Sequence, residues 1–126
     1  MVIYLAGPYS SDNPEITEAY VDMATQVTHM LQRAGYAVIC PHMLYTQDSH
    51  LSYENVMEQC LDLLEICDYI IRLPGKSRGA DLEVLVAKKL GLTLPPNSLA
   101  EIPLILEKAD KIYLSIIEKY YTPGKN

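Results

Sequence analysis

The sequence has no long apolar run, and none of its hydrophobic stretches approaches the roughly 20 residues that a membrane-spanning helix needs. Its first residues also lack the basic and then apolar segment that is typical of a secretory signal. These absences predict a cytoplasmic protein without a membrane partner. Cations are few as well, with 10 Lys and Arg against 16 Asp and Glu. The formal net charge of −6 argues against a nucleic-acid polymer as partner, because such surfaces need clustered cations.

The chain has only three cysteines, and it has no tryptophan and no phenylalanine. Cys40, Cys60 and Cys67 are odd in number, lie in apolar surroundings and lack C-x-x-C spacing, so we expect buried, reduced thiols. Neither His nor Cys occurs at metal-ligand spacing, so no metal and no cofactor is expected. The 10 tyrosines serve as the general-purpose aromatic residue, and most of them are expected in packing.

The apolar pattern alternates between short strand-like runs and stretches with helical spacing. We expect strands over residues 2–6, 36–40 and 69–73 and helices over about 53–65 and 80–90. A further helix follows the first strand, is capped by Asp12 or Asn13 and ends at Gly35. This order predicts parallel strands that are joined by right-handed crossovers. The expected fold class is therefore α/β, a single-domain Rossmann-like parallel sheet flanked by helices.

The single domain, residues 1–126, divides into a core over 1–94 and a C-terminal helical extension over 98–121. Residues 92–94 form a short last strand in this interpretation, because the prolines that follow prevent further pairing. The C-terminal helix, expected over 104–121, has two apolar rows. One row covers the sheet, and the other is covered either by a partner subunit or by the chain itself.

A small polar loop lies between the strand at 69–73 and the helix at 80–90. Open α/β sheets bind ligands at the carboxyl ends of their strands, and this loop lies at such an end. Its two glycines permit close backbone approach, and a serine hydroxyl and two cations stand beside the helix start, which suits an anion. These residues are Gly75, Lys76, Ser77, Arg78 and Gly79. After the loop the apolar residues recur at helical spacing, and the helix is expected to end at Gly91; these apolar residues are Leu82, Leu85, Val86 and Leu90.

Three motifs, in this order along the chain, resemble the nucleoside 2-deoxyribosyltransferase superfamily. They are Ile3-Tyr4-Leu5-Ala6-Gly7-Pro8-Tyr9, Cys67-Asp68-Tyr69-Ile70-Ile71, and Gly75-x-Ser77-x-Gly79-Ala80-x-x-Glu83-x-x-x-Ala87-x-x-x-Gly91. The resemblance covers about residues 1–94. It implies a flavodoxin-like or Rossmann-like fold and cleavage or transfer of an N-glycosidic bond in a small-molecule nucleoside or nucleotide. It also implies a homo-oligomer, a dimer or a tetramer, whose subunits complete one another's sites.

The resemblance implies that Glu83 is the catalytic nucleophile. A carboxylate in the first turn of a helix is held ionised by backbone N–H groups and the helix dipole, by about 0.3–1 kcal/mol. Such a carboxylate can attack the anomeric carbon of a sugar, and the glycosyl-enzyme then passes to water or to another base. Ser77 matches a serine that binds phosphate in nucleotide-cleaving relatives, and Arg78 adds a charge-assisted contact. This pair favours a nucleoside 5'-monophosphate over a free nucleoside.

Other expected substrate contacts lie at the ends of the first two strands. Gly7 and Ser10 belong to the loop after the first strand, where Ser10 helps to hold phosphate or sugar. Tyr9 and His42 are expected to line the base side of the pocket. The alternative for His42 is a hydrogen-bonded structural group, which is the commoner use of an isolated histidine.

The chain departs from the superfamily at the residue that handles the leaving base. Many relatives have an aspartate eight residues before the one matched by Asp68, and here that position is Cys60. Asp68 itself is expected to order the start of its strand. A thiol cannot replace the carboxylic acid, so the proton would come from Asp81, Glu58, Asp62 or a neighbouring chain. A non-catalytic module that binds or senses a nucleotide therefore stays open as an alternative. An NAD glycohydrolase-like activity is a third possibility, because that chemistry also breaks an N-glycosidic bond with a glutamate.

Overall fold

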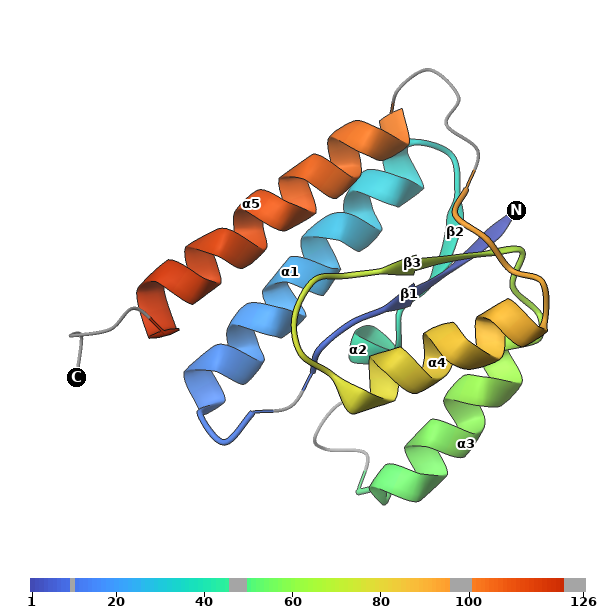
Figure 1. Cartoon of the computed structure of the whole chain (residues 1–126), viewed down its shortest axis with the longest axis horizontal. Helices are drawn as coiled ribbons and strands as arrows, with labels where there is room; N and C mark the ends of the chain where they lie inside the picture. The colour runs from blue at the N-terminus through green and yellow to red at the C-terminus, as the bar shows by residue number, and fades with distance from the viewer. Residues whose placement is uncertain (10, 46–49, 96–100, 122–126) are drawn as a thin grey trace.

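A computed structural model describes residues 1–9, 11–45, 50–95 and 101–121, and it shows a mixed α/β fold (Figure 1). Three parallel strands form the central sheet in the order β2-β1-β3. They are β1 (Val2–Ala6), β2 (Ala37–Ile39) and β3 (Tyr69–Arg72). The Rossmann-like fold class that the sequence predicted is confirmed.

Helices cover both faces of this sheet (Figure 1). They are α1 (Pro14–Arg33), α2 (Pro41–Leu44), α3 (Tyr53–Leu64), α4 (Arg78–Lys89) and α5 (Glu101–Tyr121). One core cluster joins α1 and α5 to one face of the sheet, and a second cluster joins α3 and α4 to the other. None of the described helices has the length and apolar character that a membrane span requires.

The strand residues alternate between these two clusters, as the period of two in a β-strand requires. Ile3 and Leu5 face α1 and α5, whereas Tyr4 and Ala6 face α3 and α4. In the parallel pairing Ala6 stands opposite Arg72, so Arg72 lies on the same face of the sheet as Tyr4. This face carries the candidate site.

Local sequence features set the ends of several elements as predicted. Asn13, one of the two expected caps, accepts a hydrogen bond through its side chain from the Glu15 N–H at 2.9 Å and begins α1. Gly35 and Gly91 follow α1 and α4 with φ of +100° and +82°, the backbone region in which glycine commonly ends a helix. Asp68 orders the start of β3, because its Oδ2 accepts the Val2 N–H at 2.7 Å.

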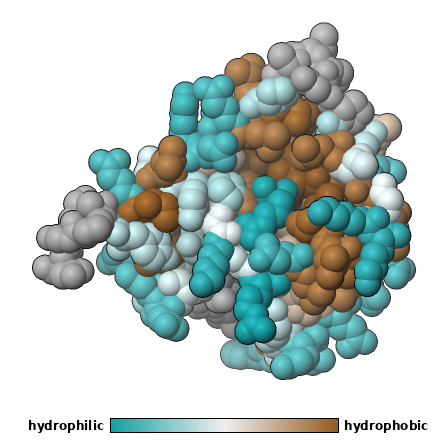
Figure 2. Space-filling model, in the orientation of Figure 1, coloured by the Kyte–Doolittle hydropathy of each residue, from teal (hydrophilic) through white to brown (hydrophobic). Residues whose placement is uncertain are grey.

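Two helical segments differ from the sequence prediction. The short helix α2 follows β2, where the sequence predicts no helix, since Pro41 fits the first helical position. The second difference concerns the apolar residues of α4. Leu82 and Leu85 are 42% and 52% exposed, so these two leucines do not join the core. Figure 2 shows apolar surface over α4.

The buried residues of α4 are instead Ala80, Glu83 and Ala87. Their spacing is also helical, but the pattern contains a charged residue and two small ones, and a search for large apolar side chains therefore chooses the other face. Small side chains let the helix lie close to the sheet. The consequence is that α4 turns a carboxylate toward the sheet.

The C-terminal part contains less sheet and more helix than expected. The predicted strand at 92–94 is reduced to one bridge, in which the Ile70 N–H donates to the Thr93 carbonyl at 2.9 Å. The last helix, α5, lies along α1. The second of the two expected apolar rows contains Leu106 and Tyr113. Both pack against the core cluster of the same chain, which favours coverage within the chain for these two residues.

Candidate functional site

The candidate site lies where the carboxyl ends of β1 and β3 meet the start of α4 (Figure 1). The Leu73 N–H donates to the Ala6 carbonyl at 2.6 Å and extends the pairing to the loop. A Cβ on Gly7 would lie 2.8 Å from the Cβ of Leu73. The close approach that Gly7 permits is therefore an approach between two strand ends of the protein itself.

Glu83 is the buried centre of the site. Its side chain is only 6% exposed, and its Oε2 accepts a hydrogen bond from the hydroxyl of the fully buried Tyr4. The thiol of Cys60, 2% exposed on α3, lies beside the Tyr4 hydroxyl. Three elements, α4, β1 and α3, thus bring together a carboxyl, a phenol and a thiol.

Tyr4 is the residue that the sequence interpretation missed, because it was read only as part of an apolar strand. A signal was present: a buried tyrosine hydroxyl must find a hydrogen-bond partner, and the neighbouring strand residues are aliphatic. The partner could not be named from the sequence, since it lies 79 residues away.

Burial raises the pKa of Glu83 to about 7, although the hydrogen bond from Tyr4 and the positive charge of Arg72 both favour the ionised form. This corrects the expectation that the helix dipole holds Glu83 ionised in a first turn. The helix begins at Arg78, so Glu83 lies beyond the first turn, where the dipole effect is small.

Burial also raises the pKa of Tyr4, and the neighbouring Glu83 raises it further. It raises the pKa of the Cys60 thiol to about 11. At neutral pH Tyr4 is therefore a neutral hydrogen-bond donor and Cys60 a neutral thiol. Of these three groups, only Glu83 changes its charge near pH 7.

Arg72 is bonded to the loop that leads into α4. Its Nη1 donates to the carbonyls of Leu73 and Gly75, the latter at 2.7 Å, and its Nη2 donates to the carbonyl of Ser77 at 3.4 Å. The same Nη2 forms an ion pair with Oδ1 of Asp81 at 2.9 Å. Asp81, expected as a possible proton donor, is 72% exposed at its side chain and serves here to anchor the loop.

Ser77 and Arg78 stand at the start of α4, beside the helix start as expected. Ser77 caps the helix, because its Oγ accepts the Ala80 N–H at 3.1 Å, and its hydroxyl hydrogen is left to donate elsewhere. Arg78 is exposed and forms no ion pair with the part of the chain that the structure describes. These two residues and the helix N–H groups lie together.

The two glycines of the loop are needed for internal packing. Gly75 has φ of +123°, and a Cβ there would lie 2.6 Å from Cγ of Pro8 and 3.3 Å from the Tyr113 ring of α5. A Cβ on Gly79 would lie 3.3 Å from the hydroxyl of Tyr53 and 3.4 Å from Sδ of Met57, both on α3. Both glycines therefore lie close to other parts of the chain, and their contact with a ligand stays a prediction.

His42 and Tyr9 lie together at the end of β1, as expected for neighbours on one side of the site. Their rings are 5.3 Å apart in an edge-on arrangement. His42 is 5% exposed, its Nε2 is 2.7 Å from the Pro8 carbonyl, and burial lowers its pKa. A neutral ring that donates to Pro8 fits the structural alternative for His42. Ser10 lies outside the described residues.

The other candidate acids are not brought to the carboxyl of Glu83. Glu58 and Asp62 are exposed on α3, whereas Cys60 between them is buried. The three cysteines are buried and free, as expected. The proton for a leaving base therefore has no evident source among these acids.

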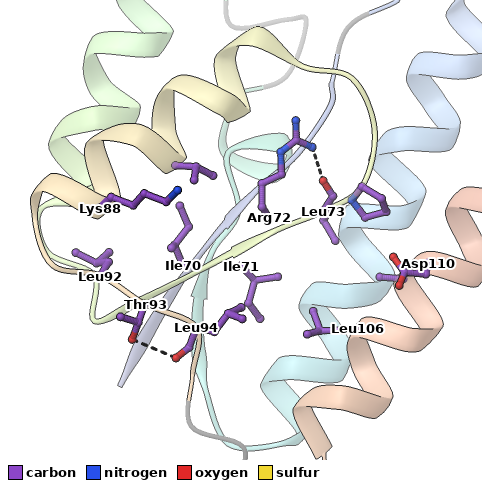
Figure 3. A pocket seen from close by; sticks show the side chains of 13 residues that line it. Ile70, Ile71, Arg72, Leu73, Lys88, Leu92, Thr93, Leu94, Leu106 and Asp110 are labelled. Carbon is purple, nitrogen blue, oxygen red and sulfur yellow. Dashed lines mark hydrogen bonds between the residues drawn. The ribbon is translucent and has the colours of Figure 1, made fainter.

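Two surface cavities lie away from Glu83. One of about 460 Å³ lies beside β3, between α4 and α5, with Lys88 on one rim and Asp110 on the other (Figure 3). The other, of about 540 Å³, lies between α1 and α5 and is lined by Glu15, Glu18 and Asp22 among others. Glu83 lines neither cavity, so the size of a cavity does not identify the candidate site. The buried carboxyl of Glu83 and its hydrogen-bond partner identify it better.

The chain matches the model of a protein family. This family is described as "Domain of unknown function (DUF4406)", and the match covers residues 1–95. The match therefore includes β1, β2 and β3 and ends before α5. No curated protein matches the chain.

Proposed function

Because the chain belongs to the DUF4406 family, a domain of unknown function, we propose its function from the site itself. The proposed reaction is cleavage or transfer of the N-glycosidic bond of a nucleoside or nucleoside 5'-monophosphate, with Glu83 as the nucleophile. The observation that carries the proposal is the buried carboxyl of Glu83, held by the Tyr4 hydroxyl and with a pKa near 7. The resemblance to the nucleoside 2-deoxyribosyltransferase superfamily supplies the substrate class.

The arrangement suits attack on an anomeric carbon. Tyr4 holds Oε2 of Glu83, which leaves Oε1 to form the bond to the sugar. As that bond forms, the glycosidic C–N bond breaks and its electron pair passes to the base, through an oxocarbenium-like transition state. Water or a second base then releases the sugar from Glu83. Because Tyr4 stays neutral, its hydrogen bond is present whether Glu83 is ionised or covalently bound.

The remaining contacts favour a nucleotide. Ser77, Arg78 and the start of α4 offer hydrogen-bond donors and one positive charge to a 5'-phosphate. Tyr9, half-buried beside His42, is proposed to contact the base. We propose that the protein acts as a homo-oligomer, a dimer or a tetramer, in which a neighbouring subunit supplies the proton for the leaving base.

Access to the carboxyl is limited, because Glu83 is only 6% exposed. A sugar therefore reaches it only if part of the chain around Glu83 moves aside.

The test is release of free base, separated by chromatography, from nucleoside monophosphates, nucleosides and NAD. We expect the native protein to release base from at least one nucleotide, and Glu83→Ala to release none above background. Glu18→Gln is the matched control, because it removes an exposed carboxylate on α1. A Glu83→Ala protein that keeps full turnover would refute the nucleophile, and nicotinamide release from NAD would indicate the NAD glycohydrolase-like alternative.

A second candidate function is favoured by Cys60. A buried thiol with a pKa of about 11 is a poor proton donor to a leaving base at neutral pH. A module that binds a nucleotide without cleaving it needs no such donor. It predicts saturable binding of a nucleoside monophosphate, no base release, and affinity that is nearly unchanged in Glu83→Gln.

A further inference from the structure

Arg72 is a charged residue at the end of a strand whose preceding residues, Ile70 and Ile71, are buried and apolar. Its side chain is only 25% exposed. Partial burial of a charge is costly unless hydrogen bonds replace the lost water. Every hydrogen bond described for this guanidinium goes to one segment, residues 73–81.

The shape of the guanidinium explains how one side chain holds a whole loop. Its two terminal nitrogens take two acceptors each: the carbonyls of Leu73 and Gly75, and the Ser77 carbonyl with the Asp81 carboxylate. A planar fork with donors in several directions can do this, whereas a lysine places its donors on one nitrogen. The loop and the first turn of α4 are thus fixed to the end of β3.

The Arg72 side chain also acts on Glu83, because its positive charge favours the ionised carboxylate. Asp81 precedes Glu83 by two residues on one rigid helix, and Arg72 shares its face of the sheet with Tyr4. The groups that bear on the charge of Glu83 are Tyr4 from β1, Cys60 from α3 and Arg72 from β3. Of these three, only Arg72 carries a positive charge.

We propose that Arg72 is the positioning residue of this site: its guanidinium holds the loop at 73–77 and the helix that carries Glu83 in one fixed geometry over the sheet. The role of Arg72 in catalysis rests on the proposed function, but its role in holding the loop and α4 does not. Arg72 touches no reacting atom in this scheme. It acts through the Ser77 loop and through Asp81.

The experiment compares native protein with Arg72→Gln and Arg72→Lys, each as the full chain. Hydrogen exchange at residues 73–81 reports the loop, and the carboxyl NMR titration of Glu83 reports its charge. In Arg72→Gln we expect loop exchange at least tenfold faster, unchanged exchange in α1, and a Glu83 midpoint at higher pH. Lys89→Gln is the control, because it removes an exposed cation from the far end of α4.

Arg72→Lys separates the two effects and keeps the proposal testable if Arg72→Gln does not fold. It retains the charge but not the fork, so its Glu83 midpoint should stay near the native value while its loop exchanges faster. If both readouts in Arg72→Gln equal those of the native protein, the proposal is overturned. Faster exchange with an unchanged Glu83 midpoint overturns it too, because Arg72 would then brace only the loop.

Activity separates this proposal from the proposed function. Where the native protein releases base, Arg72→Gln and Arg72→Lys should both lower kcat at least tenfold, and Arg72→Gln should also move the acid limb of the pH profile to higher pH. An unchanged kcat in both variants overturns the role of Arg72 in positioning. If the native protein releases no base, the proposed function fails, and the exchange and titration results still decide whether Arg72 positions Glu83.

Discussion

Replacing Glu83 with glutamine should make the protein more stable at neutral pH. Burial raises the pKa of this carboxyl from its ordinary 4.5 to about 7 in the folded protein. Between these values the folded protein keeps a proton that the unfolded chain has released, so the free energy of unfolding falls as the pH rises. The stability that the protonated carboxyl contributes is complete below pH 4.5 and is lost by the time the pH passes about 7.

The size of this loss follows from the difference between the two pKa values. Each unit corresponds to about 1.4 kcal/mol, so the full loss is about 3 kcal/mol. Glutamine has nearly the same shape, keeps an oxygen that accepts from Tyr4, and does not ionise. Relative to the native protein, Glu83→Gln should therefore gain up to about 3 kcal/mol above pH 7 and little below pH 4.5.

The assay is urea unfolding, followed by circular dichroism, at a series of pH values between about 4.5 and 8.5. The difference between the two proteins isolates Glu83, because His42 and the other titrating groups are common to both. Glu18→Gln controls for the removal of a carboxylate from a helix. A difference that does not change with pH, or a variant that is less stable than the native protein at pH 8, would refute the reasoning.

Two more predictions concern neighbours of Glu83. Tyr4→Phe removes a hydrogen bond to a charged group, worth about 1.5–3 kcal/mol, so the carboxyl titration of Glu83 should move up by about 1–2 pH units; an unmoved midpoint would contradict this. Gly75→Ala should lower the free energy of unfolding by about 2 kcal/mol or more, because φ is +123° and the Cβ would lie 2.6 Å from Pro8. Gly35→Ala, with φ of +100° and nothing within 4 Å, should cost less in the same urea assay, and equal losses would refute the packing argument.

The fold was predictable where local chemistry decides the structure. The three strands are short apolar runs, and the ends of α1 depend on Asn13 and Gly35, whose roles follow from backbone geometry. The face that α4 buries was not predictable in this way. Leu82 and Leu85 are more hydrophobic than Ala80 and Ala87, so a search for apolar residues favours the face that the structure leaves exposed.

The candidate site was predictable in part for the same reason. Ser77 and Arg78 follow from their place at a helix start, which is local information. The partner of Tyr4 and the use of Gly75 and Gly79 depend on contacts between distant segments, such as the approach of Pro8 to Gly75. A glycine has the same sequence pattern whether a ligand or another part of the chain needs the space.

The cost of Glu83 is itself an argument for a function at this position. Its buried neighbours on α4 are Ala80 and Ala87, so a small apolar residue would suit the same face and would spare the protein the loss of about 3 kcal/mol near pH 7. Tyr4 and Arg72 lower that cost, but a purely structural helix would need neither. A buried group that destabilises the fold, with partners on two strands that adjust its charge, is the pattern that active sites show. If Glu83→Gln is more stable and also inactive, stability has been traded for chemistry at this carboxyl; if it is more stable and fully active, the carboxyl needs another explanation.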